Sequence, residues 1–178
     1  MISMENLILV DNDDNEIGVM EKLKVHELGL LHRAFSVFIF DTRGRMLLQQ
    51  RAFTKYHSGG LWSNACCGHP TQNEVTHQAA VRRLKEELGF VTQLKEIFRF
   101  KYCAELDNCL FENEIDHVFI GQYEGQIIPN IEEVNSFTYK NIEDINSDLL
   151  CNDNSSLYTT WFNIIFQQVR NWHKQNYI

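Results

Sequence analysis

The chain has 178 residues, of which 44% are hydrophobic, and its formal net charge is −8. This length and apolar content predict one domain, residues 1–178, built around a single core. The acidic charge argues against a general binder of nucleic acid or of membrane surfaces, because both need a basic footprint. An acidic protein that binds an anionic ligand must therefore neutralise that ligand locally, with metal ions or a few placed cations.

The cysteines and the N-terminus indicate where such a protein works. There are five cysteines, an odd number, and two of them are adjacent with no C-x-x-C spacing. This is a poor disulfide framework and favours a reducing compartment. The first residues show no secretory signal, and no apolar run approaches the ~20 residues of a transmembrane helix. We therefore expect a soluble cytoplasmic protein that does not engage a membrane.

In chain order, runs rich in β-branched and aromatic residues alternate with turn residues such as Asn, Asp and Gly. Strands are expected over residues 6–10, 16–20, 33–40, 45–51, 91–100, 101–104, 110–123 and 136–140. Besides a central helix, helices are expected within residues 22–31, over 142–150 and over 155–174. This mixture predicts the α+β class, as an α/β/α sandwich with a mixed β-sheet between helices.

The chain is organised around residues 61–90, LWSNACCGHPTQNEVTHQAAVRRLKEELGF. Thr71 followed by Glu74 fits a capping box, which predicts a helix that starts there and ends at Gly89. The apolar stripe expected to face the core consists of Ala80, Val81, Leu84 and Leu88. Arg83 and Glu87, four residues apart, lie along one edge of that stripe. They form either a simple i,i+4 salt bridge or a pair directed at a ligand beside the core.

Histidines and acids form a second pattern that points to a metal. Glu112 and Glu114 are two residues apart in an expected strand, so both side chains project from the same face, and Asp116 continues that face. Two close carboxylates repel one another unless a cation lies between them. The candidate ligands are His26, His32, His69, Glu112 and Glu114. Such a set suits an octahedral divalent ion, Mn²⁺, Mg²⁺ or Zn²⁺, without distinguishing among them.

The central stretch resembles the Nudix box, a loop–helix–loop that holds a divalent cation against a diphosphate. The matching positions are Gly68, Glu74, Arg82, Leu84, Glu86, Glu87, Gly89 and Phe90. Two features depart from the box of Nudix hydrolases: Arg83 stands where they have glutamate, and Cys67 and His69 flank the first glycine. With these departures, NACCGHP is similar to the active-site signature of type 1 isopentenyl-diphosphate isomerases, enzymes of isoprenoid biosynthesis.

The resemblance implies roles for residues along most of the chain. His26, His32, His69, Glu112 and Glu114 match the family's metal ligands, and Glu87 matches a ligand for a Mg²⁺ that bridges both phosphates. Lys22, Arg51, Lys55 and Arg83 are the candidate cations for the diphosphate, where an arginine fork binds two oxygens and a lysine acts as a point charge. The implied partner is a small isoprenoid diphosphate, bound by a monomer or a weak homodimer.

The same resemblance implies an acid–base pair for moving an alkene double bond. Cys67 and Glu114 would flank the substrate from opposite sides, and the order of proton transfer stays open. Tyr102 would hydrogen-bond the glutamate, and the face of Trp161 would meet a carbocation, unless both are simply core residues. We expect Cys67 to lie in a loop leading into the helix, where the terminal amides favour thiolate.

Two other classes of function compete with the isomerase. A Nudix hydrolase of a diphosphate would need glutamate at position 83 and would have no use for Cys67. A non-catalytic diphosphate-binding Nudix module would tolerate loss of the acid–base pair, yet the chain keeps Cys67 and Glu114. The sequence therefore favours the isomerase.

Overall fold

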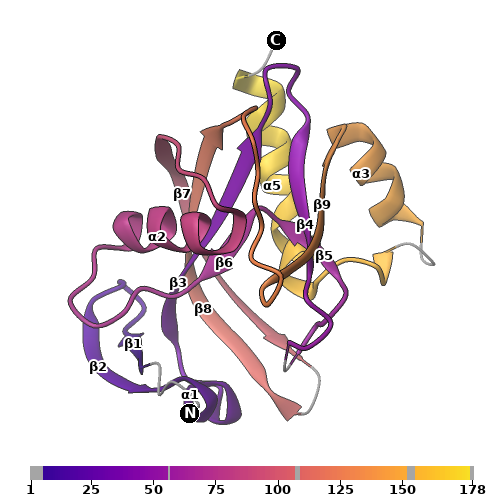
Figure 1. Cartoon of the computed structure of the whole chain (residues 1–178). Coiled ribbons are helices and arrows are strands. Elements are labelled where there is room, and N and C mark those ends of the chain that lie inside the picture. The colour runs from indigo at the N-terminus through magenta and orange to yellow at the C-terminus, as the bar shows by residue number, and fades with distance from the viewer. Residues whose placement is uncertain (1–5, 56, 107–108, 152–154, 177–178) are drawn as a thin grey trace.

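The structure, a computed structural model, describes residues 6–55, 57–106, 109–151 and 155–176. A mixed sheet runs through the molecule, with helix α2 over one face and helices α3 and α5 over the other (Figure 1). The strands in this part of the chain are β1 Asn6–Val10, β2 Glu16–Glu21, β3 His32–Phe40, β4 Met46–Arg51, β5 Trp62–Asn64, β6 Cys66–Gly68, β7 Leu94–Glu105, β8 Phe111–Gln122 and β9 Val134–Lys140. The helices are α1 Lys22–Leu28, α2 Thr76–Leu88, α3 Ile142–Leu150 and α5 Thr160–Asn176. The α+β prediction is confirmed.

Most expected elements are present, and the differences fall around the central stretch. Two short strands that the sequence analysis did not expect, β5 and β6, occupy the segment before α2. Residues 91–100 and 101–104 were expected as two strands, but the structure has one continuous strand, β7. Within the described residues, no helix is both long and apolar enough to cross a membrane.

Strand β3 is the centre of the sheet. It pairs antiparallel with β1, β4 and β6, and parallel with β8 along its whole length. The β3–β8 register sets His32 beside Glu114, and the antiparallel β7–β8 register sets Tyr102 on the other side of Glu114. The β3–β6 register places Ser36 opposite Cys67. Backbone pairing alone therefore aligns residues that are far apart in the sequence.

Alternation along β3 divides the core into two layers. Phe35, Val37 and Ile39 pack under α2 with its alanine and leucine stripe, whereas Phe38 and Phe40 pack toward α5. Burial of each of these apolar side chains stabilises the fold by about 1.5–3 kcal/mol relative to leaving it exposed. The adjacent cysteines divide in the same way, since Cys66 belongs to the α2 layer and Cys67 packs against the α5 layer.

Helix α2 begins later than expected. Its first residue is Thr76, and its N-cap, Val75, makes no side-chain capping bond. The Thr71–Glu74 pair makes only half of a capping box, because the Glu74 side chain accepts from the amide and the hydroxyl of Thr71, while the Glu74 amide bonds the Thr71 carbonyl and closes a turn before the helix. Both oxygens of Glu74 also bind Arg82, at 2.7 and 2.8 Å. This ion pair joins the turn to the helix. The helix ends as predicted, with Gly89 left-handed at φ 77°.

Candidate active site

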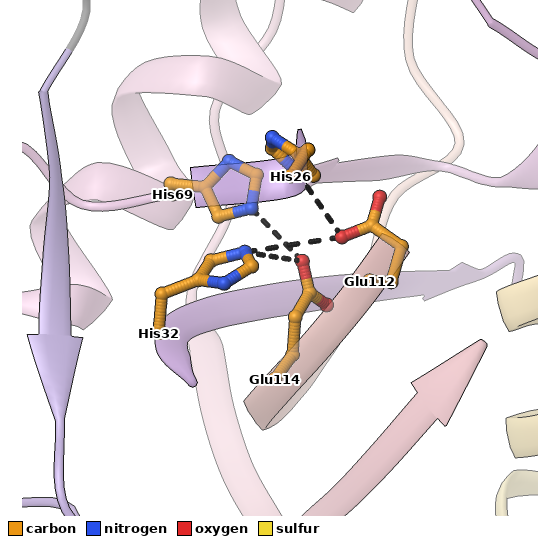
Figure 2. A group of neighbouring side chains, drawn as sticks. All are labelled: His26, His32, His69, Glu112 and Glu114. Carbon is orange, nitrogen blue, oxygen red and sulfur yellow. Dashed lines mark hydrogen bonds and ion pairs between the residues drawn. The ribbon is translucent and has the colours of Figure 1, made fainter. Parts of the chain in front are cut away.

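A buried group of three histidines and two glutamates lies where α1, β3, β6 and β8 converge (Figure 2). One possible ligand atom from each of His26, His32, His69, Glu112 and Glu114 lies within 4.8 Å of all the others. His26 Nε2 is 3.3 Å from Glu112 Oε2, and His32 Nε2 is 3.3 Å from Glu114 Oε1. His69 Nε2 is 2.9 Å from the same Glu114 oxygen. The structure thus brings all five predicted ligands together.

Local structure explains how these residues meet. Glu112 and Glu114 share a face of β8, as alternation predicts, and β3 starts with His32 beside Glu114. Helix α1 supplies His26 and ends at Gly29, whose φ of 61° lets the chain turn into β3. A Cβ at Gly29 would come within 3.4 Å of Phe111, so the turn is also closely packed.

The hydrogen bonds of the group favour a cation. His26 Nδ1 lies 2.7 Å from the carbonyl of Lys22, and His32 Nδ1 lies 2.8 Å from that of Leu30. Because a carbonyl only accepts, both Nδ1 atoms carry a proton, so in the neutral imidazoles both Nε2 atoms present a lone pair to the group. These two Nε2 atoms and Glu112 Oε2 are buried without a hydrogen bond. Buried acceptors left in this way fit a divalent ion.

Without a bound ion, the pKa values of the group are set by burial and by its own charges: burial lowers the pKa of His32, but Glu114 and Glu112 raise it overall. Burial, followed by the charge of His32, lowers the pKa of His69 well below its usual value, which keeps that imidazole neutral. Burial raises the pKa of Glu114, but its contacts with His32 and Tyr102 outweigh that effect and bring the pKa to about 2. Glu114 is therefore a carboxylate and His69 a neutral donor, which are the forms that bind a metal.

A cavity of ≈ 230 Å³ opens next to this group. Its wall includes both members of the predicted acid–base pair, Cys67 and Glu114, together with Tyr102 and Trp161. The hydroxyl of Tyr102 donates to Glu114 Oε2 at 2.7 Å. A pocket of this size fits a small ligand and is smaller than a typical drug-sized site.

The environment of Cys67 differs from the prediction. It lies in strand β6, well before the first residue of α2, so no helix terminus acts on it. Burial, followed by the charge of Asp116, raises the pKa of its thiol to about 12. Its sulfur lies 3.1 Å from Asn64 Oδ1 and 3.5 Å from Ser36 Oγ. The expectation of a thiolate favoured by helix amides is therefore wrong: Cys67 is a thiol in this structure.

All four predicted phosphate-binding cations, Lys22, Arg51, Lys55 and Arg83, line the cavity. Arg83 donates to Glu87 at 2.7 Å and to Glu86 at 2.8 Å. Burial lowers the pKa of Arg83, but Glu87 and other acids raise it overall, so the side chain is a permanent cation.

Glu87, the predicted Mg²⁺ ligand, is buried at the cavity wall and held on both oxygens. Gln49 Nε2 donates to Oε2 at 2.8 Å, while Arg83 and, at 3.5 Å, the Cys66 thiol bind Oε1. The carboxylate is thus fixed in place before any ligand arrives. The i,i+4 salt bridge between Arg83 and Glu87 is present, but it lies at the wall of the cavity and not on the outer surface.

Several cavity residues were missed from the sequence. Glu133 pairs with Lys55 and lies 3.3 Å from Arg83, so an acid stands among the predicted phosphate-binding cations. His57 packs edge-on against Trp161 with ring centroids 5.7 Å apart, although it was set aside as structural or surface. Burial, followed by the charge of Arg51, lowers the pKa of His57 to about 4. Both residues come from loops, and no motif marked either.

Comparison with known proteins agrees with this architecture. The family model described as the NUDIX domain matches residues 30–160. A solved structure from Deinococcus radiodurans superposes with a TM-score of 0.76 over 92% of this chain and 98% of that one, at 14% identity. The NUDIX domain of Shewanella oneidensis NrtR, solved with ADP-ribose, gives a TM-score of 0.60 over 80% and 87%, at 15% identity. The chain therefore belongs to the Nudix family.

Sequence relatives narrow the class. An isopentenyl-diphosphate Delta-isomerase of Serratia proteamaculans is 48% identical over 93% of this chain and 91% of its own length. One from Photobacterium profundum is 47% identical over 96% and 97%. Within the Nudix family, the chain is a member of the isopentenyl-diphosphate Delta-isomerases.

Proposed function

We propose that this chain converts isopentenyl diphosphate to dimethylallyl diphosphate by moving a proton onto one end of an allylic unit and removing one from the other. The observation that carries the proposal is that Cys67 and Glu114 line one small cavity that also contains the four cations. A hydrolase would require neither this pair nor an arginine at position 83. The membership of the isomerase family supports the same reaction.

The diphosphate would lie against Lys22, Arg51, Lys55 and Arg83. In the free chain some of these cations are already paired with acids, for example Lys55 with Glu133. A diphosphate carries more charge than one carboxylate and accepts from several donors at once, so it can displace such a partner. A Mg²⁺ that bridges both phosphates would be held by Glu87, whose carboxylate is already oriented.

A divalent ion, Mn²⁺, Mg²⁺ or Zn²⁺, would be held by His26, His32, His69, Glu112 and Glu114. When bound, it would favour the carboxylate form of Glu114 and so make the protonated form a stronger acid. Six-coordinate oxygen-rich sites suit Mn²⁺ and Mg²⁺, and imidazole suits Zn²⁺, so this mixed set admits all three. The ligands themselves are fixed by backbone register and by the carbonyl contacts of His26 and His32.

The chain's own residues would handle two protons per turnover. One member of the Cys67–Glu114 pair gives a proton to the terminal alkene carbon, which leaves a tertiary cation. The other takes a proton from the carbon next to the C–O carbon, and the double bond forms there. Each member finishes in the other's starting state, so the pair carries one proton before and after the turnover and none while the cation exists. Tyr102 bonds Glu114, and the π-face of Trp161 stabilises the cation.

Water must be kept from that cation, because it would trap it as an alcohol. The inner wall of the cavity is formed by buried side chains, including Tyr102 and Trp161, which are 9% and 6% exposed. The cations and the diphosphate would fill the polar end. The arrangement thus separates a charged end from an enclosed end suited to a five-carbon tail.

Proton NMR of isopentenyl diphosphate incubated with the protein and Mg²⁺ in heavy water tests the proposal directly. Deuterium entering the new methyl group is the expected result. Release of inorganic phosphate without deuterium would favour the hydrolase. An unchanged substrate spectrum together with saturable binding would favour the non-catalytic module.

A further inference from the structure

A continuous line of hydrogen bonds connects Trp161 on α5 with Cys67 on β6. The indole Nε1 of Trp161 donates to Ser63 Oγ at 2.9 Å, and Ser63 Oγ donates to Asn64 Oδ1 at 3.0 Å. The Cys67 thiol donates to the same Asn64 oxygen at 3.1 Å. Two adjacent residues of β5, Ser63 and Asn64, thus bridge side chains that lie far apart in the sequence.

The middle of this bridge has only one possible orientation. The amide nitrogen of Asn64 donates to the carbonyl of Val37 at 3.1 Å and to that of Cys66 at 2.9 Å. Since those carbonyls only accept, the Asn64 side chain must direct its oxygen to Ser63 and Cys67. Asn64 is 0% exposed, so no solvent competes for that oxygen.

The serine end is constrained in a similar way. A hydroxyl has one hydrogen, and Ser63 gives it to Asn64, so Ser63 accepts from Trp161. Thr159 Oγ1, 3.1 Å from Ser63 Oγ, then acts as a second donor. Backbone bonds from Thr159 to Trp62, and from Trp62 to Leu157, fasten the start of α5 to β5. The bridge therefore lies between backbones that are themselves tied together.

The thiol has a second polar neighbour, on β3. Ser36 Oγ is 3.5 Å from Cys67 Sγ and donates to Asp116 Oδ2 at 2.7 Å. A cysteine side chain has few rotamers, and the hydrogen bond to Asn64 together with the contact to Ser36 favours one of them. The Cys67 sulfur is thereby held in one orientation at the wall of the cavity. Trp161 lines the same cavity.

We propose that Ser63 and Asn64 are positioning residues that hold the Trp161 ring and the Cys67 sulfur at a set separation across the substrate pocket. This inference rests on the proposed function, in which the ring faces the cation and the sulfur exchanges a proton. Neither Ser63 nor Asn64 is a catalytic residue, because each acts through a neighbour. A displacement of about 1 Å in such a constellation can cost 10²-fold in rate.

The test begins with Ser63→Ala, which removes the hydroxyl that links the indole to Asn64. We expect kcat to fall by about ten- to a hundredfold, within the range that misplacement gives. KM should change less than kcat, because Ser63 bonds Trp161 and reaches the predicted phosphate-binding cations only through that ring, over which Arg51 lies at 5.2 Å. Ser63→Thr keeps the hydroxyl and should restore most of kcat. Ser63→Cys, with a weak sulfur acceptor, should be intermediate and serves if the alanine variant folds poorly.

A matched control is Thr159→Val, because the Thr159 hydroxyl is equally buried but lies one bond outside the bridge. Because this hydroxyl donates to Ser63 but does not link Trp161 to Asn64, its loss should lower kcat much less than Ser63→Ala does. A loss of kcat in Thr159→Val equal to that in Ser63→Ala would mean that any buried hydroxyl here matters for stability alone, and it would overturn the proposal.

A spectroscopic readout separates positioning from activity. The indole N–H signals of metal-free ¹⁵N-labelled protein are assigned by single Trp→Phe variants. Ser63→Ala should move the Trp161 signal upfield, because the N–H loses its oxygen acceptor. Cys67→Ala should also move it, through Asn64, whereas removal of the exposed thiol in Cys151→Ala should not.

The outcomes distinguish this inference from the proposed function. A Trp161 signal that ignores Ser63→Ala, or an alanine variant with wild-type kcat, would refute the bridge even if the wild type isomerises its substrate. If the Trp161 signal moves in both Ser63→Ala and Cys67→Ala but the wild type does not isomerise its substrate, the proposed function is refuted and the bridge remains a structural link.

Discussion

Tyr102 and Glu114 lie opposite one another in the β7–β8 ladder, and the phenol of Tyr102 gives Glu114 Oε2 a 2.7 Å hydrogen bond inside the sheet. Both side chains are buried at the wall of the cavity. A hydrogen bond to a charged group contributes about 1.5–3 kcal/mol. The pair therefore determines both where the glutamate lies and how readily it holds a proton.

We predict that Tyr102→Phe lowers kcat by about 10- to 150-fold, the equivalent of that bond energy, and changes KM by less than about threefold. Steady-state kinetics with isopentenyl diphosphate measure both constants. Tyr123→Phe is the control, since Tyr123 bonds the carbonyl of Gln126 at an exposed turn. Equal kcat values for Tyr102→Phe and the wild type would remove Tyr102 from the catalytic set.

A divalent ion bound to the histidine–glutamate group should stabilise the fold. We predict that a saturating ion, at about a hundred times its Kd, adds about 2.7 kcal/mol and raises Tm by roughly 5–11 °C. Thermal unfolding of metal-stripped protein with added Mn²⁺, Mg²⁺ or Zn²⁺ measures this shift and ranks the three ions.

The variant that tests this site is Glu112→Gln, which removes one charged ligand and should abolish most of the shift. His77→Gln is its control, because His77 is an exposed residue of α2 that bonds the Leu94 carbonyl. Should Glu112→Gln and His77→Gln respond to the ions alike, the ions bind elsewhere.

Arg83 and Arg82 are adjacent in α2 but face different surroundings, which makes them a natural matched pair. Arg83 lines the cavity, whereas Arg82 binds Glu74 in the turn before the helix. We predict that Arg83→Gln raises KM at least about tenfold, because a charge-assisted bond to the diphosphate is lost. Arg82→Gln should leave KM within about twofold. A KM that is unchanged in Arg83→Gln would argue that the diphosphate binds away from this helix.

Most of the site residues that the sequence predicted lie in residues 61–90, because motif residues close in sequence keep their spacing on one loop and one helix. Cys67, Glu87 and Arg83 were found in this way, and alternation in a strand paired Glu112 with Glu114. Their convergence with His26 and His32 was expected only from the family resemblance. This convergence depends on the parallel β3–β8 register, which no local sequence pattern indicates.

What could not be read from the sequence has a shared physical cause. The strands β5 and β6 have three residues each and form only because β4 and β3 pair with them. Without β6, Cys67 was placed in a loop leading into the helix, and the direction of its pKa shift was predicted wrongly. Glu133 and His57 reach the cavity from loops, where tertiary contacts alone decide position.

The turn before α2 should make the fold sensitive to acid. The hydrogen bond from Arg82, against an opposing effect of burial, lowers the pKa of Glu74 from 4.5 to about 2. A lowered pKa in the folded state means that stability is complete above about pH 4.5 and is lost as the pH falls toward 2. Because the pair is partly exposed, we predict a contribution of only about 0.5–1 kcal/mol.

Urea unfolding of metal-free protein across this pH range measures the effect. Glu74→Gln should lower the unfolding free energy by that amount at pH 6 and flatten its slope between pH 4.5 and 2. The exposed Glu132→Gln should change neither. If Glu74→Gln keeps the wild-type slope, the Arg82–Glu74 pair does not hold the turn.

The last prediction concerns the thiol itself. Cys67→Ala should lower kcat by about 10²–10⁴-fold, the usual contribution of a positioned acid or base. Its metal content should stay near that of the wild type, because Cys67 is not among the five grouped ligands. Steady-state kinetics and metal analysis of the same preparation measure both. Cys151→Ala, which removes an exposed free thiol, controls for nonspecific effects of losing sulfur.

The two readouts matter together because each excludes a different alternative. Lost turnover with lost metal would make Cys67 a structural support of the histidine–glutamate group, since His69 follows two residues later. Retained turnover would show that the proton passes between Glu114 and some other group of the cavity. Only lost turnover with retained metal agrees with a thiol that meets the substrate directly.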